Sequence, residues 1–196
     1  MKALNYLKDK DLVYACWLTR KEASSTLNAP HNHISQNASL RVNDQELKNR
    51  KSLGLTPAWR LNIKNCLKYI NSQKEKIYWE DIKKGKNLLN LDQFGDVIIA
   101  RKDILTSYHL SVTVDDNSDG VTHIIRGNDL KSYTNIHRLL QVLLNLRETK
   151  WFHHKLVKDT NGKRIAKRSN SKLTIKELRE NDFSAKEVIN LAKSNT

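Results

Sequence analysis

The sequence predicts an α/β fold, and three observations support this prediction. The apolar run at residues 97–100 fits a buried strand, and residues 121–125 fit another. Apolar residues then recur at helical spacing from Ile136 to Leu144, which places one apolar stripe on a helix of about 14 residues. Strands followed by a helix that must pack on them are typical of an α/β layer.

The first part of the chain predicts a small α/β unit of its own. Residues 3–7 fit the end of a helix that leads into a strand at residues 12–16. Thr19 and Glu22 have the Thr-x-x-Glu spacing of a helix capping box. Residues 24–51 are polar and show little periodicity, which predicts a long loop or an excursion from the core, without a catalytic group.

Alternation of apolar and polar residues predicts further strands. Residues 59–63 and 77–79 alternate in this way, and we expect them to form a small antiparallel pair beside the main fold. Residues 110–114 also alternate, which predicts a strand, and the polar run 115–120 predicts the turn after it. A strand near residues 152–157 and two capped helices at the end of the chain complete the expected order.

Composition restricts the class of protein and its partners. The 196 residues include 35 Lys and Arg against 21 Asp and Glu, and the formal net charge is +14, which favours a polyanion such as nucleic acid as partner. With 38% apolar residues, 6 Gly and 2 Pro, a folded domain is expected and disorder is excluded for most of the chain. Cys16 and Cys66 are too far apart in sequence for a disulfide framework or a self-contained zinc site.

The location predicted by the sequence is the cytoplasm. No window has the 18 or so continuous apolar residues that a membrane helix needs, and charged residues interrupt the N-terminus where a signal peptide would have its apolar core. We therefore expect a soluble protein without a membrane partner.

Basic residues are concentrated near the C-terminus. Nine basic and two acidic residues lie between Arg147 and Lys172, around the turn-forming residues 159–162. They would clamp a polyphosphate or a nucleic-acid backbone, or alternatively form an ordinary solvated loop. Trp151 and Phe152 would stack on a base or anchor a strand, and core packing is the favoured interpretation.

Other polar clusters do not predict a metal site. Asp115, Asp116 and Asp119 match no complete calcium loop, so a solvated turn is favoured over a cation site. His153 and His154 would face opposite sides of a strand, without identifiable partners for a metal. The sequence also contains no GxSxG, Walker or GxGxxG motif, which excludes the common hydrolase, P-loop and dinucleotide signatures.

Four ordered stretches resemble the second half of the catalytic domain of glutamyl-tRNA synthetases. They are GDVIIARKD at 95–103, SYHLSVTVDD at 107–116, GVTHIIRGNDL at 120–130 and DTNGKRIAKR at 159–168. The likeness is greatest to the short members of this class I family, the glutamyl-Q tRNA(Asp) synthetases, and the end of the chain near residue 196 favours them. Residues 12–22 and 58–61 resemble the middle section of the family, so the resemblance covers nearly the whole chain.

The resemblance implies a partial class I synthetase catalytic domain of Rossmann-like α/β fold, with a small inserted α/β subdomain. On this basis we expect an inserted or connecting subdomain with a long polar loop at residues 1–94. The second half of the catalytic domain would follow at 95–158, and a loop like the family's KMSKS signature with C-terminal helices at 159–196.

The resemblance also implies roles for five residues. Tyr108 and Arg126 match positions that bind glutamate, and a guanidinium suits a carboxylate. Asp129, Arg164 and Lys167 match the ATP site, where Lys167 would act as the catalytic residue that neutralises the phosphates as pyrophosphate leaves. The alternative for Arg126 is a structural salt bridge with Asp129.

Two departures from the family affect the expected activity. Leu18 stands where the family has its second zinc-binding cysteine, and of the family's ligands only Cys16 remains, so we expect zinc binding to be lost. The first class I signature, a HIGH-type motif, belongs to a segment that would precede Met1, and without it activation of glutamate should be impaired.

The predicted function is that of an aminoacyl-tRNA synthetase-like ligase. It would activate glutamate with ATP and Mg²⁺ and transfer it to the queuosine of tRNA(Asp), acting as a monomer. The alternatives are a non-catalytic tRNA-binding fragment and a degenerate remnant of a glutamyl-tRNA synthetase.

Overall fold

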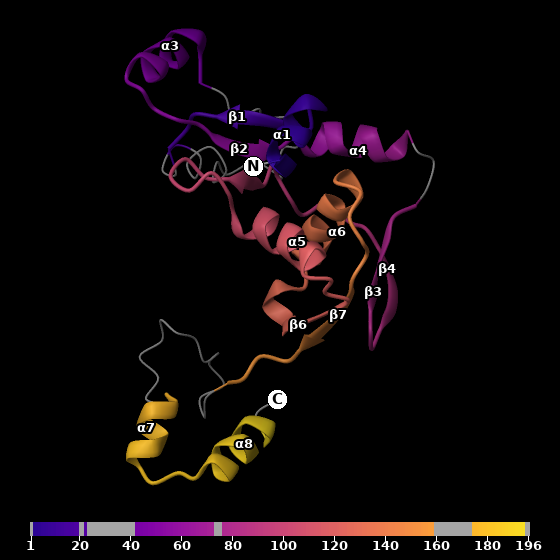
Figure 1. Ribbon diagram of the computed structural model, residues 1–196, viewed down its shortest axis with the longest axis vertical. Coiled ribbons are helices and arrows are strands. Elements are labelled where there is room, and N and C mark those ends of the chain that lie inside the picture. Colours follow the sequence, from indigo (N-terminus) through magenta and orange to yellow (C-terminus); the bar gives the residue numbers. More distant parts are fainter. Residues whose placement is uncertain (1, 20–21, 23–41, 73–75, 159–173, 195–196) are drawn as a thin grey trace.

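The computed structural model describes residues 2–19, 22, 42–72, 76–158 and 174–194 (Figure 1). Its helices are α1 (Lys2–Asp9), α3 (Asp44–Ser52), α4 (Ile63–Asn71), α5 (Tyr108–Ser118), the 3₁₀ helix η1 (Asn128–Leu130), α6 (Thr134–Leu143), α7 (Ile175–Glu180) and α8 (Ala185–Ser194). Its strands are β1 (Val13–Cys16), β2 (Ala58–Leu61), β3 (Tyr78–Asp81), β4 (Gly85–Leu88), β5 (Ile98–Ala100), β6 (His123–Gly127) and β7 (Lys150–His154). None of these helices is long and apolar enough to span a bilayer.

The strands form two sheets. The first has the order β1-β2-β5, and both of its pairings are antiparallel, with Val13 opposite Leu61 and Arg60 opposite Ile98. The second has the order β4-β3-β7-β6, in which β3, β7 and β6 run parallel and β4 closes a hairpin onto β3. Each sheet takes strands from both sides of residue 94, and the domain boundary expected there stays a prediction.

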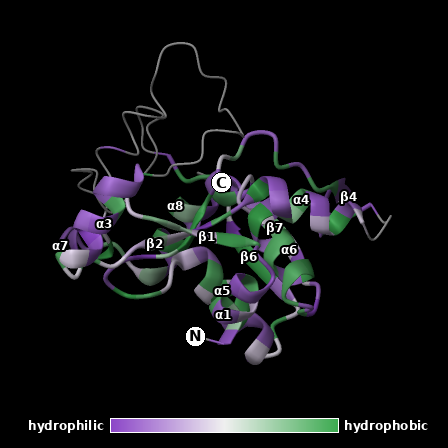
Figure 2. Cartoon of the chain, turned by 90° about the horizontal axis from the view of Figure 1, so that it is seen from above, coloured by the Kyte–Doolittle hydropathy of each residue, from purple (hydrophilic) through white to green (hydrophobic). Residues whose placement is uncertain are grey.

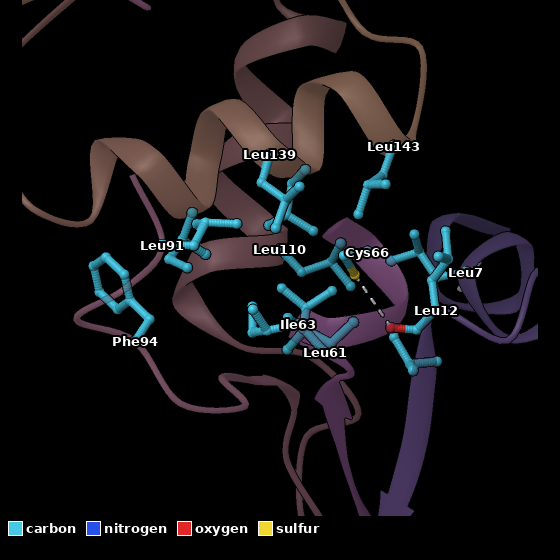
Figure 3. Packing of buried hydrophobic residues seen from close by; sticks show 14 of the residues in the cluster. Leu7, Leu12, Leu61, Ile63, Cys66, Leu91, Phe94, Leu110, Leu139 and Leu143 are labelled. Atoms are coloured by element: carbon cyan, nitrogen blue, oxygen red, sulfur yellow. Dashed lines mark hydrogen bonds between the residues drawn. The ribbon is translucent and has the colours of Figure 1, made fainter. Parts of the chain in front are cut away.

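One apolar core joins the first sheet to α1, α4, α5 and α6 (Figure 3). Leu61, Ile99, Leu139 and Leu140 are completely buried in it. Full burial of a side chain of this size contributes about 1.5–3 kcal/mol, so these contacts account for much of the attachment of α6. Figure 2 shows the contrast with α3, which is mostly hydrophilic and buries no residue.

The predicted strand at residues 110–114 is wrong, because these residues lie in α5. Leu110 and Thr113 are the buried residues of this helix, and their spacing of three fits one helical face. The hydroxyl of Thr113 donates to the carbonyl of His109 over 2.8 Å, a bond within the helix that makes a β-branched residue acceptable there. The turn predicted at residues 115–120 is confirmed only at its end, because α5 continues to Ser118.

Two further predictions are corrected by the sheet topology and by α3. β2 and β3 do not pair with each other but lie in different sheets, because alternation indicates a strand and does not specify its partner. The polar segment at residues 24–51 was predicted to be a loop, but its last part forms α3. The helix has no apolar stripe that would have predicted it. Instead, the Asn43 side chain caps α3 by accepting a hydrogen bond from the amide of Glu46.

Several predicted elements are confirmed. Helix α1 leads into β1, and β5, β6, α6 and β7 lie close to their expected positions. The capping box at Thr174 is formed in α7, and the Ser184 hydroxyl and the Glu187 carboxylate exchange the same contacts at the start of α8. The predicted packing role of Trp151 is also confirmed, since its side chain is completely buried.

Candidate functional site

Three of the five residues that the resemblance assigns to substrates lie around the carboxyl end of β6. Tyr108 is the first residue of α5, while Arg126 lies in β6 and Asp129 in η1 directly after it. Arg164 and Lys167 lie outside the described residues, so their roles stay predictions. Because β6 and β7 are parallel, their carboxyl ends share the kind of edge at which α/β proteins bind ligands.

Arg126 is the best-defined side chain of this site. It is only 9% exposed. Its Nη1 atom lies 2.9 Å from Nδ1 of His137, and its Nη2 atom donates to the Thr134 hydroxyl over 2.5 Å. Its Nε atom donates to Nε2 of His153 over 3.4 Å. The guanidinium is thus fixed by side chains from both α6 and β7.

Two of the surrounding imidazoles stay neutral near Arg126. Burial, followed by the positive charge of Arg126 and the neighbouring His109, lowers the pKa of His137 to about 2. Burial and Arg126 also lower the pKa of His109, whose Nδ1 atom lies 3.0 Å from Nε2 of His137. Burial lowers the pKa of Arg126 itself, and the nearby Tyr108 and Asp129 oppose this effect. The site therefore holds a buried cation between neutral side chains.

The buried carboxylate of Asp81 is connected to Arg126 through His153. The Nδ1 atom of His153 lies 3.2 Å from Oδ2 of Asp81, and the other carboxylate oxygen accepts bonds of 3.0 Å from the backbone amides of Lys83 and Lys84. Burial raises the pKa of Asp81, but these hydrogen bonds outweigh it, so the pKa lies below its ordinary value. Asp81 is thus ionised and orients His153.

Tyr108 presents an open surface beside the buried Arg126. Its side chain is 51% exposed, and its ring makes edge contacts with His109 and His137 at centroid distances of 5.6 and 5.8 Å. A ligand could therefore reach the phenol from solvent while the imidazoles support the ring from behind. This arrangement is suited to an anionic group that meets a hydroxyl donor and a guanidinium together.

Asp129 folds back over the end of β6. A Cβ atom at Gly127 would overlap the Asp129 carboxylate and press against Leu156, so the backbone there can carry only glycine without a shift. The hydrogen bonds of Arg126 go to Thr134, His137 and His153, and Asp129 acts on Arg126 as a nearby charge. The salt-bridge alternative therefore does not account for how Arg126 is held.

The residues at the family's zinc position do not fit a zinc ion. Cys16 is buried at the end of β1, and the leucine side chain at position 18 offers no donor atom. In the part of the chain that the structure describes, no three His, Cys, Asp or Glu side chains are grouped to hold a metal. Loss of zinc stays a prediction, because most of residues 20–41 lies outside that part.

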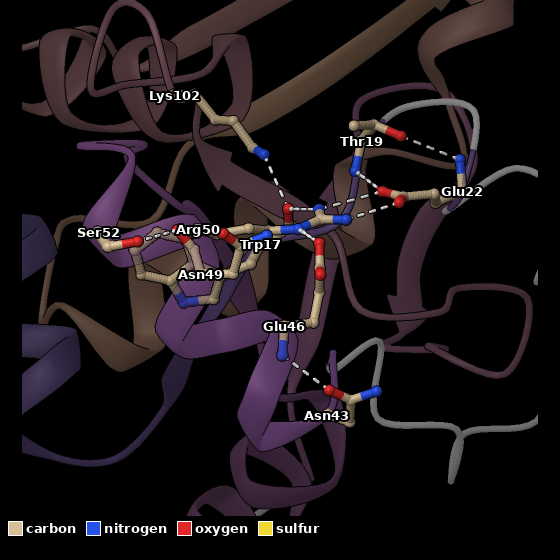
Figure 4. Close-up of polar contacts among 9 residues, drawn as sticks. All are labelled: Trp17, Thr19, Glu22, Asn43, Glu46, Asn49, Arg50, Ser52 and Lys102. Atoms are coloured by element: carbon tan, nitrogen blue, oxygen red, sulfur yellow. Dashed lines mark hydrogen bonds and ion pairs between the residues drawn. The ribbon is translucent and has the colours of Figure 1, made fainter.

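An ion-pair cluster holds the segment that follows Cys16 (Figure 4). Arg50 of α3 donates to the Trp17 carbonyl over 2.6 Å and to both carboxylate oxygens of Glu22 over 2.7 and 3.2 Å. It also pairs with Glu46 one turn earlier on the helix over 2.6 Å. The predicted Thr19–Glu22 capping contacts are both present. These contacts tie α3 to the end of β1.

Sequence reasoning missed most of the side chains that hold Arg126. His109 and His137 were not considered, and His153 was considered only as a metal ligand. A signal was available in α6, where Thr134, His137 and Gln141 are all buried and recur at helical spacing beside the apolar stripe. Buried polar residues on one helical face indicate a hydrogen-bonded network rather than a solvated surface.

Comparisons with known proteins agree on one group of relatives. A family model described as class I tRNA synthetases (E and Q), catalytic domain, matches residues 14–193. A glutamyl-Q tRNA(Asp) synthetase of Rhodobacter capsulatus is 34% identical over 178 residues, 87% of this chain and 63% of that protein. Glutamate–tRNA ligase 2 of Bartonella tribocorum is 31% identical over 182 residues, 90% of this chain and 40% of that protein.

Solved structures show the same fold. The glutamate-tRNA synthetase of Elizabethkingia anophelis superimposes with a TM-score of 0.63 at 19% identity, over 89% of this chain and 36% of that one. A glutamate tRNA ligase of Elizabethkingia meningosepticum, solved in complex with its amino acid, gives a TM-score of 0.61 at 20% identity. The chain spans less than two thirds of the length of each of these four proteins.

Proposed function

Because the chain belongs to the catalytic-domain family of the class I tRNA synthetases for glutamate and glutamine, we propose that it acts in the ATP-dependent activation of glutamate. The activated glutamate would be transferred to the queuosine of tRNA(Asp), as the name of the Rhodobacter relative suggests. The protein would work as a monomer in the cytoplasm.

One observation carries the choice of an acidic substrate: a buried, rigidly held arginine beside an exposed tyrosine. Arg126 keeps its charge between neutral imidazoles, and the Tyr108 hydroxyl lies close enough to raise the pKa of Arg126. A carboxylate is the ligand that a guanidinium binds with two parallel hydrogen bonds. In this proposal Arg126 and Tyr108 bind a glutamate carboxylate.

The proposed reaction has two steps. The α-carboxylate of glutamate attacks the α-phosphate of ATP, supplied as its Mg²⁺ complex, and the bond to the departing pyrophosphate breaks. Lys167 and Arg164 would neutralise the charge of the leaving phosphates, and Asp129 would help to form the nucleotide site. The glutamyl adenylate then transfers its acyl group to a hydroxyl of the tRNA nucleoside and releases AMP.

A second candidate function is tRNA binding without adenylate formation. One observation favours it: the formal net charge of +14. Binding to the phosphate backbone needs positive charge and no complete catalytic site. A degenerate remnant would carry the same charge and would bind tRNA only weakly and without specificity.

Glutamate-dependent exchange of pyrophosphate into ATP tests the enzymatic proposal. The proposal is supported if the 196-residue chain catalyses exchange, if Lys167→Ala abolishes it and if Lys172→Ala does not. Lys172 is the matched control because both lysines lie in the same basic stretch. Arg126→Gln should also abolish exchange, while Arg101→Met should not, because Arg101 pairs only with Asp103 on the surface in the described part of the chain. No exchange above background by the wild-type chain rejects the proposal.

Filter binding of tRNA over a salt titration then separates the remaining candidates. Specific retention of tRNA(Asp), with an affinity that falls steeply as salt rises, supports the binding module. Equal and weak retention of all tRNAs supports the degenerate remnant.

A further inference from the structure

The hydrogen bonds of Arg126 leave a defined part of its guanidinium for a ligand. A guanidinium has five N–H donors. One donor each on Nε, Nη2 and Nη1 is directed to His153, Thr134 and His137. Beyond these three bonds, two N–H groups remain, one on each terminal nitrogen, and the Tyr108 hydroxyl lies within hydrogen-bonding reach of the guanidinium. Two donors on neighbouring nitrogens are what a bidentate carboxylate requires.

The contacts with His137 determine the position of the protons on two imidazoles. Arginine can only donate, so Nδ1 of His137 must accept, and the proton of the neutral ring lies on Nε2. This proton is then donated to Nδ1 of His109, 3.0 Å away. The proton of a neutral His109 is therefore on its Nε2 atom. The three residues form one directed chain that starts at Arg126.

Thr134 and His153 form a second directed chain on the other side of the guanidinium. The Thr134 hydroxyl accepts from Arg126, so its single proton is directed to Nε2 of His153, 3.0 Å away. Nε2 of His153 also faces the Nε–H group of Arg126 and cannot carry a proton. The proton of His153 therefore lies on Nδ1 and is donated to Asp81.

The chemical type of the partners matters for the ligand. A carboxylate bound directly to Arg126 would neutralise its charge and compete with an anionic ligand. The partners Thr134, His137 and His153 are instead uncharged, and the nearby carboxylates of Asp116 and Asp129 act on Arg126 only through space. The nearest carboxylate hydrogen-bonded into this network, Asp81, is separated from Arg126 by His153.

We infer that Thr134, His137 and His153 are positioning residues that aim the two remaining N–H groups of Arg126 at one carboxylate of the substrate. This inference rests on the proposed function, because it takes glutamate as the ligand. His137 has the largest part, since it connects Arg126 to His109 and also contacts the Tyr108 ring. Removing it should loosen Arg126 without removing its charge.

Two variants of His137 separate positioning from general structure. His137→Gln keeps an acceptor and a donor in reach of both neighbours, whereas His137→Leu keeps the volume and removes both. The exposed His123 of β6 provides the control His123→Leu. Thermal unfolding should first establish that all three variants are folded at the temperature used.

The first measurement needs no ligand. In ¹⁵N NMR spectra at pH 7 we expect the Nε2–H form for His109 and His137, the Nδ1–H form for His153, and a rigid Arg126 Nε–H vector. This vector should become mobile in His137→Leu and rigid again in His137→Gln. A protonated His137, or an Arg126 that stays equally rigid in a folded His137→Leu variant, would overturn the inference. If His137→Leu is unfolded, the same comparison is made with Thr134→Val, which should also release Arg126.

The second measurement uses glutamate as the probe. Loss of a hydrogen bond that positions a charged group is expected to weaken binding about tenfold or more in His137→Leu, while His137→Gln and His123→Leu should stay within about threefold of the wild type. Equal affinity in His137→Leu and the wild type would overturn the inference. A wild-type chain that binds no glutamate, yet shows the expected protonation and a rigid Arg126, contradicts the proposed function and leaves the positioning of Arg126 established.

Discussion

The guanidinium of Arg50 holds both carboxylate oxygens of Glu22, over 2.7 and 3.2 Å, across a gap of 28 residues in the sequence. Arg50→Met should therefore release the segment that begins at Trp17. Hydrogen exchange at the amides of Thr19 and Glu22 should become faster, because the Glu22 carboxylate loses the guanidinium that holds it and the capping contacts between Thr19 and Glu22 loosen. In Arg101→Met, which breaks a surface pair with Asp103, exchange at these amides should not change. Unchanged exchange in both variants would contradict the clamp.

Acid should weaken the same contact between Arg50 and Glu22. Hydrogen bonds from Arg50, then from Thr19, lower the pKa of Glu22 to about 2. The folded pKa lies below the ordinary value of 4.5, so this contribution is present above that value and is lost as the pH falls toward 2. The protection of the amides of residues 17–19, measured as exchange relative to the intrinsic rate at each pH, should therefore fall between pH 4.5 and 2 in the wild type and much less in Arg50→Met.

The stability of the whole chain should fall in mild acid, because of the neutral histidines around Arg126. Burial depresses the pKa of His137 to about 2, whereas in the unfolded chain it titrates near 6.5. The unfolded state then binds more protons below pH 6.5, so the free energy of unfolding falls by about 1.4 kcal/mol per pH unit for this residue. Burial also lowers the pKa of His109, which adds to this effect. Urea titrations from pH 7 to 5 should show a shallower fall for His137→Gln than for the control His123→Gln.

The two thiols should be unreactive in the folded protein. Cys16 and Cys66 are both buried, and the Cys66 thiol donates to the Leu12 carbonyl over 3.6 Å (Figure 3). Burial, together with the charge of Asp96, raises the pKa of Cys66 to about 12, so almost no thiolate is present at pH 8. A thiol reagent should label neither cysteine within minutes at pH 8, and both in guanidinium chloride. Rapid labelling of Cys66 in the native protein would contradict this packing.

A glycine should be needed at position 127 because of the nearby Asp129 side chain, and not because of the backbone conformation at that position. Its φ of −66° is open to any residue, so the cost of Gly127→Ala comes from overlap with the Asp129 carboxylate and Leu156. We expect Gly127→Ala to destabilise the protein by about 1–3 kcal/mol and Gly127→Ala/Asp129→Ala to recover part of the loss. Gly120→Ala is the contrasting control, because Gly120 has open space around it and a φ of +71°, so its cost should not depend on Asp129. Additive effects at 127 and 129 would contradict this contact.

The family and the α/β class were predicted from the sequence and are confirmed, because both depend on features that the chain carries locally. The stripe of α6 and the apolar run of β5 are such features. The strand predicted at residues 110–114 failed for a physical reason: Leu110 and Val114 are four residues apart, which satisfies a helical face as well as an alternating one.

The surroundings of Arg126 could be predicted only in part. Tyr108 and Arg126 were selected by resemblance, and the structure brings them together. The support by His137 of α6 and His153 of β7 depends on how these two elements pack, and no local pattern specifies which imidazole faces which neighbour. The buried spacing of Thr134 and His137 on one face of α6 was the available signal.

The exchange of strands across residue 94 has a consequence for how the chain folds. β5 completes the sheet begun by β1 and β2, and β7 completes the one begun by β3 and β4, so neither half of the sequence contains a finished sheet. The β2–β5 and β3–β7 pairings therefore form only after long loops have closed, and the two halves should melt in one cooperative transition. Halves produced separately by a cut between β4 and β5 should be unfolded alone and should regain structure only when mixed.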